Sequence, residues 1–269
     1  MNKVLFREFS ETSSRLWPQE PNLLTRHDFY FENCIADTPE LIEMAYALRY
    51  QVYVTERQFE NADEHADGLE TDQFDSHSRL GLVFHRPTGE ALGTVRLIQP
   101  VKGDPDSLPI AGMLRRNGFD ICDYVAVDRT QEISRFAISK RVRRRITDEP
   151  GAAAVAPLSR EERIRRGSLV CLSLMQLMLR NALVDGTTYC TAVMEEKLLR
   201  MLASMGLHLK PIGPLVFHHG LRQPSFSYIP EMLERCKREQ RDFWDVITNC
   251  GELTEKLDRM ILKQTAMVC

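Results

Sequence analysis

Hydrophobic residues near the start of the chain are spaced first for a strand and then for a helix. Phe29–Ile35 can form a strand. Thr38 is a favourable N-cap, and Pro39 suits the first helical position. Apolar residues then recur on one helical face as far as Arg57, at Leu41, Ala45, Leu48 and Val52. Residues 1–28 show little periodicity and are expected to form a peripheral helix or arm.

Two strand-like runs follow, at residues 79–85 and 91–98. The turn between them contains Pro87 and Gly89, which predicts a β-hairpin. Residues 99–120 then form a long connection, and a short helix is expected there near Ala111–Arg116. Loops of this length are usually functional or variable.

A βαβ unit is expected in the middle of the chain. Residues 132–138 are β-prone, Ser168–Val184 is apolar on nearly every side, and Tyr189–Met194 is a second buried strand. A strand, a crossover helix and a second strand form a parallel pair. The helix approaches the length of a membrane span, but polar residues interrupt it, which favours a buried core helix. These residues are Ser173, Gln176, Arg180 and Asn181.

The remaining segments predict short elements and a helical end. A helix and two short strands are expected at Glu195–Met205, His208–Ile212 and Leu215–His219. Gly206 ends the helix, and Trp244 is expected to anchor the charged helices near the C-terminus. We therefore expect one α/β domain over residues 1–229, with a helical extension over residues 230–269 that packs on the same domain.

Composition is that of an ordinary globular protein. The 269 residues are 43% hydrophobic and 27% charged, and a net charge of -3 gives no global attraction to nucleic acid or anionic membrane. The seven cysteines form no CxxC pair, which argues against a disulfide framework and a zinc site. The N-terminus lacks an apolar signal segment, so a cytoplasmic protein without a membrane span is expected.

Two charged residues, Glu132 and Arg135, interrupt the central strand. Charge inside a buried strand is costly unless it is paired or functional. Side chains three residues apart on a regular strand point to opposite faces. We therefore expect a β-bulge between Ser134 and Ala137 that brings both charges into one site. A purely structural ion pair is the alternative.

Acidic residues and arginines recur in a fixed order before this strand. The motifs are Leu48-Arg49, Glu70-x-Asp72-Gln-Phe-Asp75, Gly93-x-Val-Arg96-Leu and Glu132-x-Ser134-Arg135-Phe136. In this order they resemble the acyl-homoserine-lactone synthases and the related N-acyl amino acid synthases, over residues 40–225. The continuation as far as Lys140, with its arginine run, most resembles acyltransferases associated with PEP-CTERM/exosortase protein sorting.

This resemblance implies a GNAT-like acyl-CoA N-acyltransferase fold, in which a mixed central sheet is flanked by helices. The strands at 132–138 and 189–194 would splay apart around the acyl-thioester arm. It implies an amide-forming acyltransferase that moves a fatty acyl group from a thioester to the amine of an amino acid or similar small molecule. The donor is expected to be acyl carrier protein, or else acyl-CoA, and no other cofactor is expected.

The resemblance also assigns roles to the motif residues. Glu132 is the candidate base or base-orienting group, and Ser134 and Arg135 complete the catalytic set. Arg135 and Arg96 are candidates for holding either the acceptor's carboxylate or the acidic cluster. The substrate-binding set is Arg49, Tyr53, Phe59, Glu70, Asp72, Asp75, Arg96 and Phe136. Within it, the two aspartates are expected to order the site through salt bridges.

The aromatic residues bear on the acceptor. Tyr53 and Phe59 stand where homoserine-lactone synthases carry a phenylalanine and a tryptophan. This difference favours an amino acid or another amine as acceptor over S-adenosylmethionine. Two alternatives stay open, an autoinducer synthase that uses S-adenosylmethionine and a non-catalytic sensor that binds acyl groups.

A basic run follows the central strand, with five cations in six residues: Lys140, Arg141, Arg143, Arg144 and Arg145. Acetyl-CoA enzymes of the GNAT fold carry a glycine-rich pyrophosphate loop at this position, and this run contains no glycine. The run therefore favours a protein-borne donor, and we predict that it docks the acidic acyl carrier protein. Nucleic acid binding by this run and by residues 160–166 is the alternative, but no recognisable nucleic-acid motif accompanies it.

Other candidate groups predict little chemistry. The acidic segment 56–75 lacks the spacing of an EF-hand, and no metal site is expected. His218 and His219, adjacent on an expected strand, would point to opposite faces and make a poor pair of metal ligands. Cys171 and Cys190 lie in apolar runs and are expected to be inert core thiols.

Overall fold

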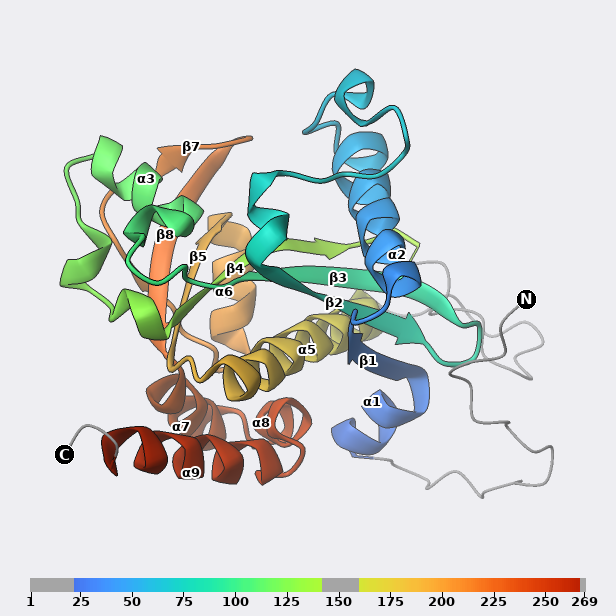
Figure 1. Ribbon diagram of the computed structural model, residues 1–269. Helices are drawn as coiled ribbons and strands as arrows, with labels where there is room; N and C mark the ends of the chain where they lie inside the picture. The colour runs from blue at the N-terminus through green and yellow to red at the C-terminus, as the bar shows by residue number, and fades with distance from the viewer. Residues whose placement is uncertain (1–21, 142–159, 267–269) are drawn as a thin grey trace.

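The computed structural model describes residues 22–141 and 160–266 (Figure 1). Its strands are β1 (Phe31–Ile35), β2 (Ser78–His85), β3 (Glu90–Ile98), β4 (Thr130–Ile138), β5 (Tyr189–Met194), β6 (Lys210–Pro211), β7 (Val216–Phe217) and β8 (Leu221–Tyr228). Its helices are α1 (Leu23–Tyr30), α2 (Pro39–Tyr50), α3 (Pro109–Arg116), α5 (Arg160–Asp185), α6 (Glu196–Ser204), α7 (Ile229–Glu239), α8 (Arg241–Thr248) and α9 (Glu252–Ala266). The mixed α/β architecture predicted from the sequence is confirmed.

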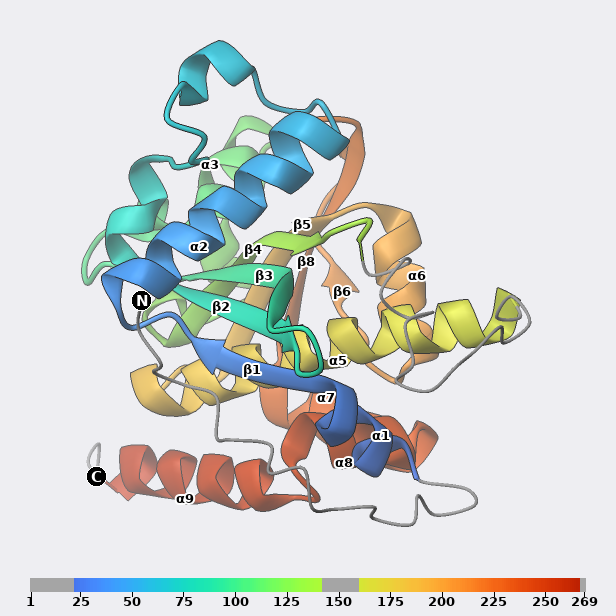
Figure 2. The same cartoon turned by 90° about the vertical axis from the view of Figure 1, so that its right-hand side faces the viewer.

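One mixed sheet forms the centre, in the order β1-β2-β3-β4-β5-β8-β6, with β7 paired to β8. Helix α5 crosses one face of this sheet, and α7, α8 and α9 form a further layer beneath it (Figures 1 and 2). Helix α2 packs on the opposite face, against β2 and β3. The sheet is therefore buried between helices on both faces.

Helix α5 is the core helix that the sequence predicts. Ser168–Asp185 is long and apolar enough to cross a membrane, but 78% of it is buried inside the protein. It lies close to the sheet where β2 and β3 carry glycines. A Cβ atom at Gly81 would come within 2.8 Å of Leu177 Cδ1, and one at Gly93 within 2.8 Å of Val170 Cγ1. Larger residues at these two positions would push the helix away from the sheet.

Helix α2 begins as the sequence predicts. The Thr38 side chain accepts a hydrogen bond from the Leu41 main-chain N–H, and Pro39 occupies the first turn. Its apolar face is buried against the sheet. After Tyr50 a π-helical turn, Gln51–Glu56, continues the helix towards the acidic segment.

The predicted bulge in β4 is confirmed. The pairing with β3 passes from Thr94 opposite Ala137 to Arg96 opposite Ser134, so β4 contains one extra residue at this point. Arg135 lies in the bulge with a φ of 47°, in the left-handed region. The extra residue changes the alternation of side chains, which lets Glu132 and Arg135 face a common site.

The predicted parallel pair is also confirmed, and it is short. Thr130–Ile133 of β4 pairs with Tyr189–Ala192 of β5. Beyond Ile133 the two strands have no further paired residues, although β4 continues to Ile138 and β5 to Met194. The strands therefore diverge, as the resemblance implies.

The prediction was wrong for β8, which it omitted. Its residues 223–228 pair with the whole of β5, but its polar residues and Pro224 hide the usual strand pattern. The two short strands predicted before it are shorter in the structure, at Lys210–Pro211 and Val216–Phe217. Of the predicted arm over residues 1–28, only the segment from residue 22 is described, and it contains most of α1.

Candidate active site

Three arginines and three carboxylates form a closed ring of ion pairs beside the bulge. Within the ring, each arginine contacts two carboxylates and each carboxylate contacts two arginines, and Arg135 also lies 3.6 Å from Glu60. In order, the N–O distances are Arg49–Glu70 2.5 Å, Glu70–Arg135 2.8 Å, Arg135–Asp72 3.1 Å, Asp72–Arg96 2.5 Å, Arg96–Asp75 3.2 Å and Asp75–Arg49 2.6 Å. The six charges cancel.

The ring joins four parts of the chain that are distant in sequence. Arg49 comes from α2, Arg96 from β3 and Arg135 from the bulge of β4, and the acids come from the segment before β2. Asp72 and Asp75 form a capping box around the short helix Gln73–His77, which fixes their side chains. Both aspartates also form the salt bridges to arginines that the sequence leads us to expect, while their role in ordering a substrate site stays a prediction.

Hydrogen bonds between its members keep the ring ionised, although burial opposes charge. The Arg49 side chain is 0% exposed. Burial alone would raise the pKa of Glu70, but hydrogen bonds from Arg49 and Arg135 lower this pKa to about 2. Burial would also raise the pKa of Asp72, but its hydrogen bond and ion pair with Arg96 lower this pKa. Removing one member would leave an uncompensated charge inside the protein.

A cavity of about 230 Å³ opens where β4 and β5 diverge. The predicted site residues that line it are Tyr53, Phe59, Asp72, Arg96, Glu132, Ser134, Arg135 and Phe136. Apolar side chains from β5 and α6 complete one wall, at Val193, Met194 and Leu198. The structure thus brings residues of three of the four motifs around one hollow, and Arg49 of the fourth motif joins them through the ring.

Three members of the predicted substrate-binding set lie behind the cavity wall. Arg49, Glu70 and Asp75 are not among the described residues that line the cavity, because the ring encloses them behind it. Arg96 and Arg135 were candidates for holding either an acceptor carboxylate or the acidic cluster, and they hold the acidic cluster. The ring is thus a support for the cavity wall.

Glu132 lies in the cavity wall and is only 3% exposed. Its Oε2 accepts the main-chain N–H of Ile110 at 2.9 Å. Burial raises the pKa of Glu132 to about 7, against the lowering effects of this N–H group and of Arg96. The carboxyl can therefore bind and release a proton near neutral pH.

The neighbours of Glu132 are fixed in orientation. Arg96 Nη2 donates to Ser134 Oγ at 3.1 Å, so the hydroxyl hydrogen of Ser134 remains free to donate elsewhere. The guanidinium of Arg135 lies over the Tyr53 ring, 5.5 Å from its centroid. Burial raises the pKa of Tyr53, which keeps its phenol protonated at neutral pH.

Sequence reasoning missed the wall formed by the β7–β8 hairpin. His218 and His219 both line the cavity, because they lie in a turn and not on a strand. Their expected projection to opposite faces was therefore wrong. His219 has a φ of 49° and stacks on Phe59 at 5.7 Å, and its Nε2 is 3.5 Å from Glu60. Gly220, directly after the two histidines, is the signal in the sequence that could have indicated this turn.

The described residues contain no group of three His, Cys, Asp or Glu side chains placed to hold a metal ion. The buried thiols of Cys171 and Cys190 behave as predicted. Burial raises the pKa of each to about 12, which keeps both protonated and unreactive at neutral pH.

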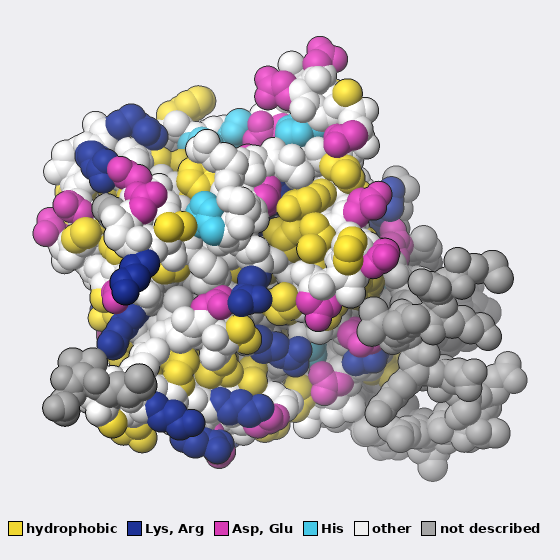
Figure 3. Space-filling view, in the orientation of Figure 1, with side chains coloured by type: hydrophobic (Ala, Val, Ile, Leu, Met, Phe, Trp, Pro, Cys, Tyr) yellow, Lys and Arg dark blue, Asp and Glu magenta, His cyan; other side chains and the backbone are white. Residues whose placement is uncertain are grey.

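The basic run is described only at its start. The main-chain N–H of Lys140 donates to the Glu56 carboxylate at 2.9 Å, and Arg141 contacts Glu90 at 3.3 Å. Arg143, Arg144 and Arg145 lie outside the described residues, so the predicted docking role stays a prediction. On the face in Figure 3, Lys and Arg gather along the lower edge, over α7 to α9, and charges of both signs are interspersed elsewhere.

Residues 48–149 match the family model described as "Acetyltransferase (GNAT) domain". The chain has the GNAT-like acyltransferase fold. TofI in a ternary complex with an inhibitor and MTA is 17% identical, with a TM-score of 0.54 over 77% of this chain and 96% of that one. BjaI, a CoA-dependent acyl-homoserine lactone synthase with SAM and isopentyl-CoA, is 16% identical, with a TM-score of 0.51 over 87% and 99%.

The AHL synthase LasI is also similar, at 16% identity and a TM-score of 0.50 over 73% of this chain and 88% of that one. Identities this low establish the fold alone. No curated protein sequence matches significantly. The predicted enzyme class, an acyltransferase, is that of the matching domain model. None of these comparisons bears on the PEP-CTERM/exosortase association, which stays a prediction.

Proposed function

We propose that the protein is an N-acyltransferase that moves a fatty acyl group from a thioester to a primary amine. The observation that carries this proposal is the buried carboxyl of Glu132, with a pKa raised to about 7, in the cavity where β4 and β5 diverge. An amine that is protonated at neutral pH must lose a proton before it attacks. A carboxylate with a pKa near neutrality suits that task.

The reaction follows from groups in the cavity wall. Glu132 takes a proton from the ammonium group, and the amine nitrogen attacks the thioester carbonyl carbon. The resulting oxyanion needs donors, and the Ser134 hydroxyl is one candidate because Arg96 occupies its oxygen as a donor. The C–S bond then breaks, the second proton that the nitrogen must lose passes to the leaving thiolate, and an amide and a free thiol are released, with the first proton left on Glu132.

The cavity wall also suits an acyl thioester. Phe136, Val193, Met194 and Leu198 are apolar residues beside the gap between the strands. Acyl carrier protein is the donor we favour, because of the basic run after β4, and acyl-CoA is the other. An amino acid is the acceptor we favour. S-Adenosylmethionine is the second candidate, because the similar structure of BjaI contains SAM.

The proposal can be tested by incubating the purified protein with acyl carrier protein or CoA thioesters. Acceptors would be supplied as a mixture of amino acids and, separately, S-adenosylmethionine. Thiol release and mass spectrometry of the product would be measured together, with Glu132→Gln as the control. Amide formation that the variant lacks supports the proposal. Bound donor without thiol release, in any mixture, would indicate an acyl-binding sensor.

A further inference from the structure

The ring arginines are poorly placed to bind an acceptor's carboxylate. Arg96 and Arg135 line the cavity, but Arg96 already contacts two carboxylates and Arg135 three. Asp72 lies between them in the cavity wall, so a second anion there would meet a negative charge at close range. An anionic acceptor therefore needs a cation elsewhere in the wall.

Arg222 on β8 is such a cation. Its Nε donates to the His218 main-chain oxygen at 2.6 Å, and its Nη2 to that of His219 at 3.3 Å, so neutral groups hold it in place. The guanidinium lies 5.6 Å from the centre of the Phe59 ring. Its ion-pair partner, Glu195, is 3.5 Å away and 40% exposed, and therefore neutralises it weakly.

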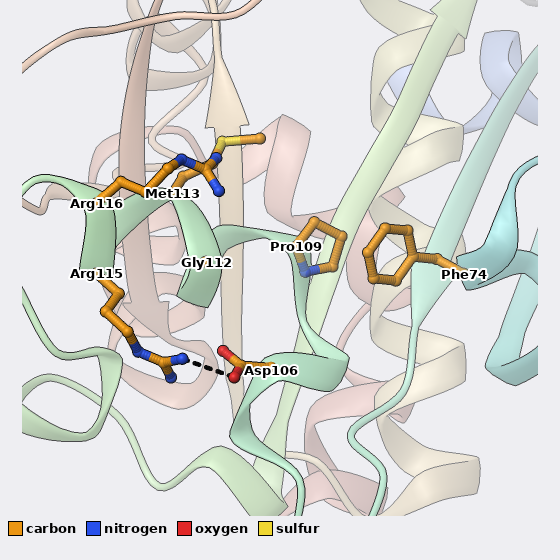
Figure 4. A pocket seen from close by; sticks show the side chains of 7 residues that line it. All are labelled: Phe74, Asp106, Pro109, Gly112, Met113, Arg115 and Arg116. Atoms are coloured by element: carbon orange, nitrogen blue, oxygen red, sulfur yellow. Dashed lines mark hydrogen bonds and ion pairs between the residues drawn. The ribbon is translucent and has the colours of Figure 1, made fainter.

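Arg116 is a second cation, at the end of α3. It lies beside Met113 in a hollow that adjoins the cavity (Figure 4). Three residues line both the hollow and the cavity: Phe74, Pro109 and Met113. The preceding residue, Arg115, instead pairs with Asp106 at 2.6 Å. Within the described part of the chain, Arg116 has no ion pair or hydrogen bond.

Met113 connects the two arginines, because it lines the hollow together with Arg116 and the cavity together with Arg222. His218 lies in the cavity wall, and its pKa is lowered to about 4 by burial and by the charges of His219, Arg222, Arg135 and Arg116. The imidazole is therefore neutral at physiological pH, and the positive potential around it comes from the arginines.

We infer that Arg116 and Arg222 bind the carboxylate of the acceptor, which is therefore an amino acid and not a simple amine. This inference rests on the proposed acyl transfer. Arginine suits the task because its planar fork grips a carboxylate through two hydrogen bonds. Buried Glu132 would then meet the amine, while the carboxylate lies on the side of α3 and the β7–β8 hairpin.

A phosphate of the donor could use the same chemistry. Helix α3 and the β7–β8 hairpin lie at one side of the molecule, whereas β4 ends towards α2, at the other side (Figure 1). The basic run that we expect to receive the donor begins at that far end of β4. The position of the two arginines thus favours the acceptor.

Binding of product analogues tests the inference without turnover. Calorimetry would compare N-dodecanoylglycine with N-methyldodecanamide, which has the same amide and chain but lacks the carboxylate. We expect wild type to bind the acid roughly tenfold to a hundredfold more tightly, as a charged hydrogen-bond pair allows. Arg116→Ala should bring the two affinities close together, while Arg115→Ala should keep the wild-type ratio.

Arg222→Gln should also lower the ratio, with a thermal melt to check the hairpin. Equal binding of both analogues by wild type, or an unchanged ratio in Arg116→Ala, would overturn the inference. The inference would also be overturned if Arg115→Ala lowered the affinity ratio as much as Arg116→Ala does.

A transfer assay distinguishes binding of the acceptor's carboxylate by the arginines from binding of a donor phosphate. With acyl-N-acetylcysteamine, a donor without phosphate, Arg116→Ala should raise the KM for an amino acid roughly tenfold or more. It should leave the KM for the matching decarboxylated amine unchanged. An effect seen only with phosphate-bearing donors would assign the site to the donor and refute the inference. Absence of amide from every acceptor would refute the proposed function alone, since the binding comparison does not depend on turnover.

Discussion

The carboxyl of Glu132 accepts the main-chain N–H of Ile110 at 2.9 Å, so the candidate base also caps a helix. Helix α3 begins after Leu108, which supplies no side-chain cap. Glu132 takes that role from β4, 22 residues away in sequence. One contact thus fixes both the base and the helix that carries Arg116.

This double role shapes the first prediction, which concerns Glu132→Gln. The amide oxygen can still accept the Ile110 N–H, so the fold should be retained, while the proton acceptor is lost. We expect kcat to fall by roughly 10²–10⁴-fold, with little change in the thermal midpoint. Stopped assays of thiol release, with circular dichroism melts, would measure both. Glu132→Ala removes the cap as well and should lower the midpoint, and near-normal turnover in Glu132→Gln would make the residue structural only.

The second prediction concerns stability and pH. The pKa of Glu132 is about 7 in the folded protein and 4.5 as its ordinary value. Between these values the folded state holds a proton that the unfolded state has released, so the free energy of unfolding falls as pH rises from about 4.5 to 7. The loss should be about 3 kcal/mol.

Denaturant titrations of wild type and Glu132→Gln across this range isolate the effect, because the acids of the ring are present in both. The variant should gain stability relative to wild type as pH rises. A difference that stays constant with pH would mean that Glu132 has an ordinary pKa.

Most of the fold could be predicted from local sequence. Apart from the bulge in β4, the main strands and helices from α2 to β5 follow recognisable hydrophobic patterns, and Thr38 with Pro39 marks the start of α2 without tertiary information. The bulge could be predicted because Glu132 and Arg135 are three residues apart. On a regular strand they would point to opposite faces, so they could share a site only if the strand contained an extra residue. Strand β8 could not be found, because its pairing with β5 overrides the local effects of Pro224.

The site could be predicted only in part. The motifs identified the members of the ring, but not that three arginines and three acids close on themselves. That closure depends on the left-handed backbone of Arg135, which the sequence does not encode locally. The histidine wall was missed because a turn, and not a strand, orients His218 and His219. The contact between Glu132 and Ile110 depends on a loop that packs back onto β4.

The third prediction concerns the ring. Arg49→Met removes one buried cation and leaves Glu70 and Asp75 without one of their two partners. We expect a loss of about 3–5 kcal/mol in the free energy of unfolding, as for other broken buried pairs. Arg79, which is 43% exposed and pairs with Asp185, offers a matched control. Arg79→Met should cost less than about 1 kcal/mol. Equal losses in urea titrations would show that the ring stabilises no more than a surface pair.

The last prediction concerns the basic run. Its first two residues are held at the end of β4 by Glu56 and Glu90, which places the start of the run beside the cavity strands. If the run docks an acidic carrier protein, Arg143, Arg144 and Arg145 should act mainly on the association rate, and salt should screen them over roughly 8 Å at physiological ionic strength. Changing all three arginines to glutamate should therefore raise the KM for acyl carrier protein severalfold.

Reaction with a small acyl thioester provides the control, because such a donor carries no acidic surface. The triple variant should use it as well as wild type does, and only turnover with the carrier should weaken as salt is added. Equal slowing with both donors would indicate that the reversal disturbs the cavity and not a docking surface. Carrier turnover that is insensitive to salt in wild type would remove the electrostatic basis of the prediction, since long-range attraction between exposed charges always falls with ionic strength.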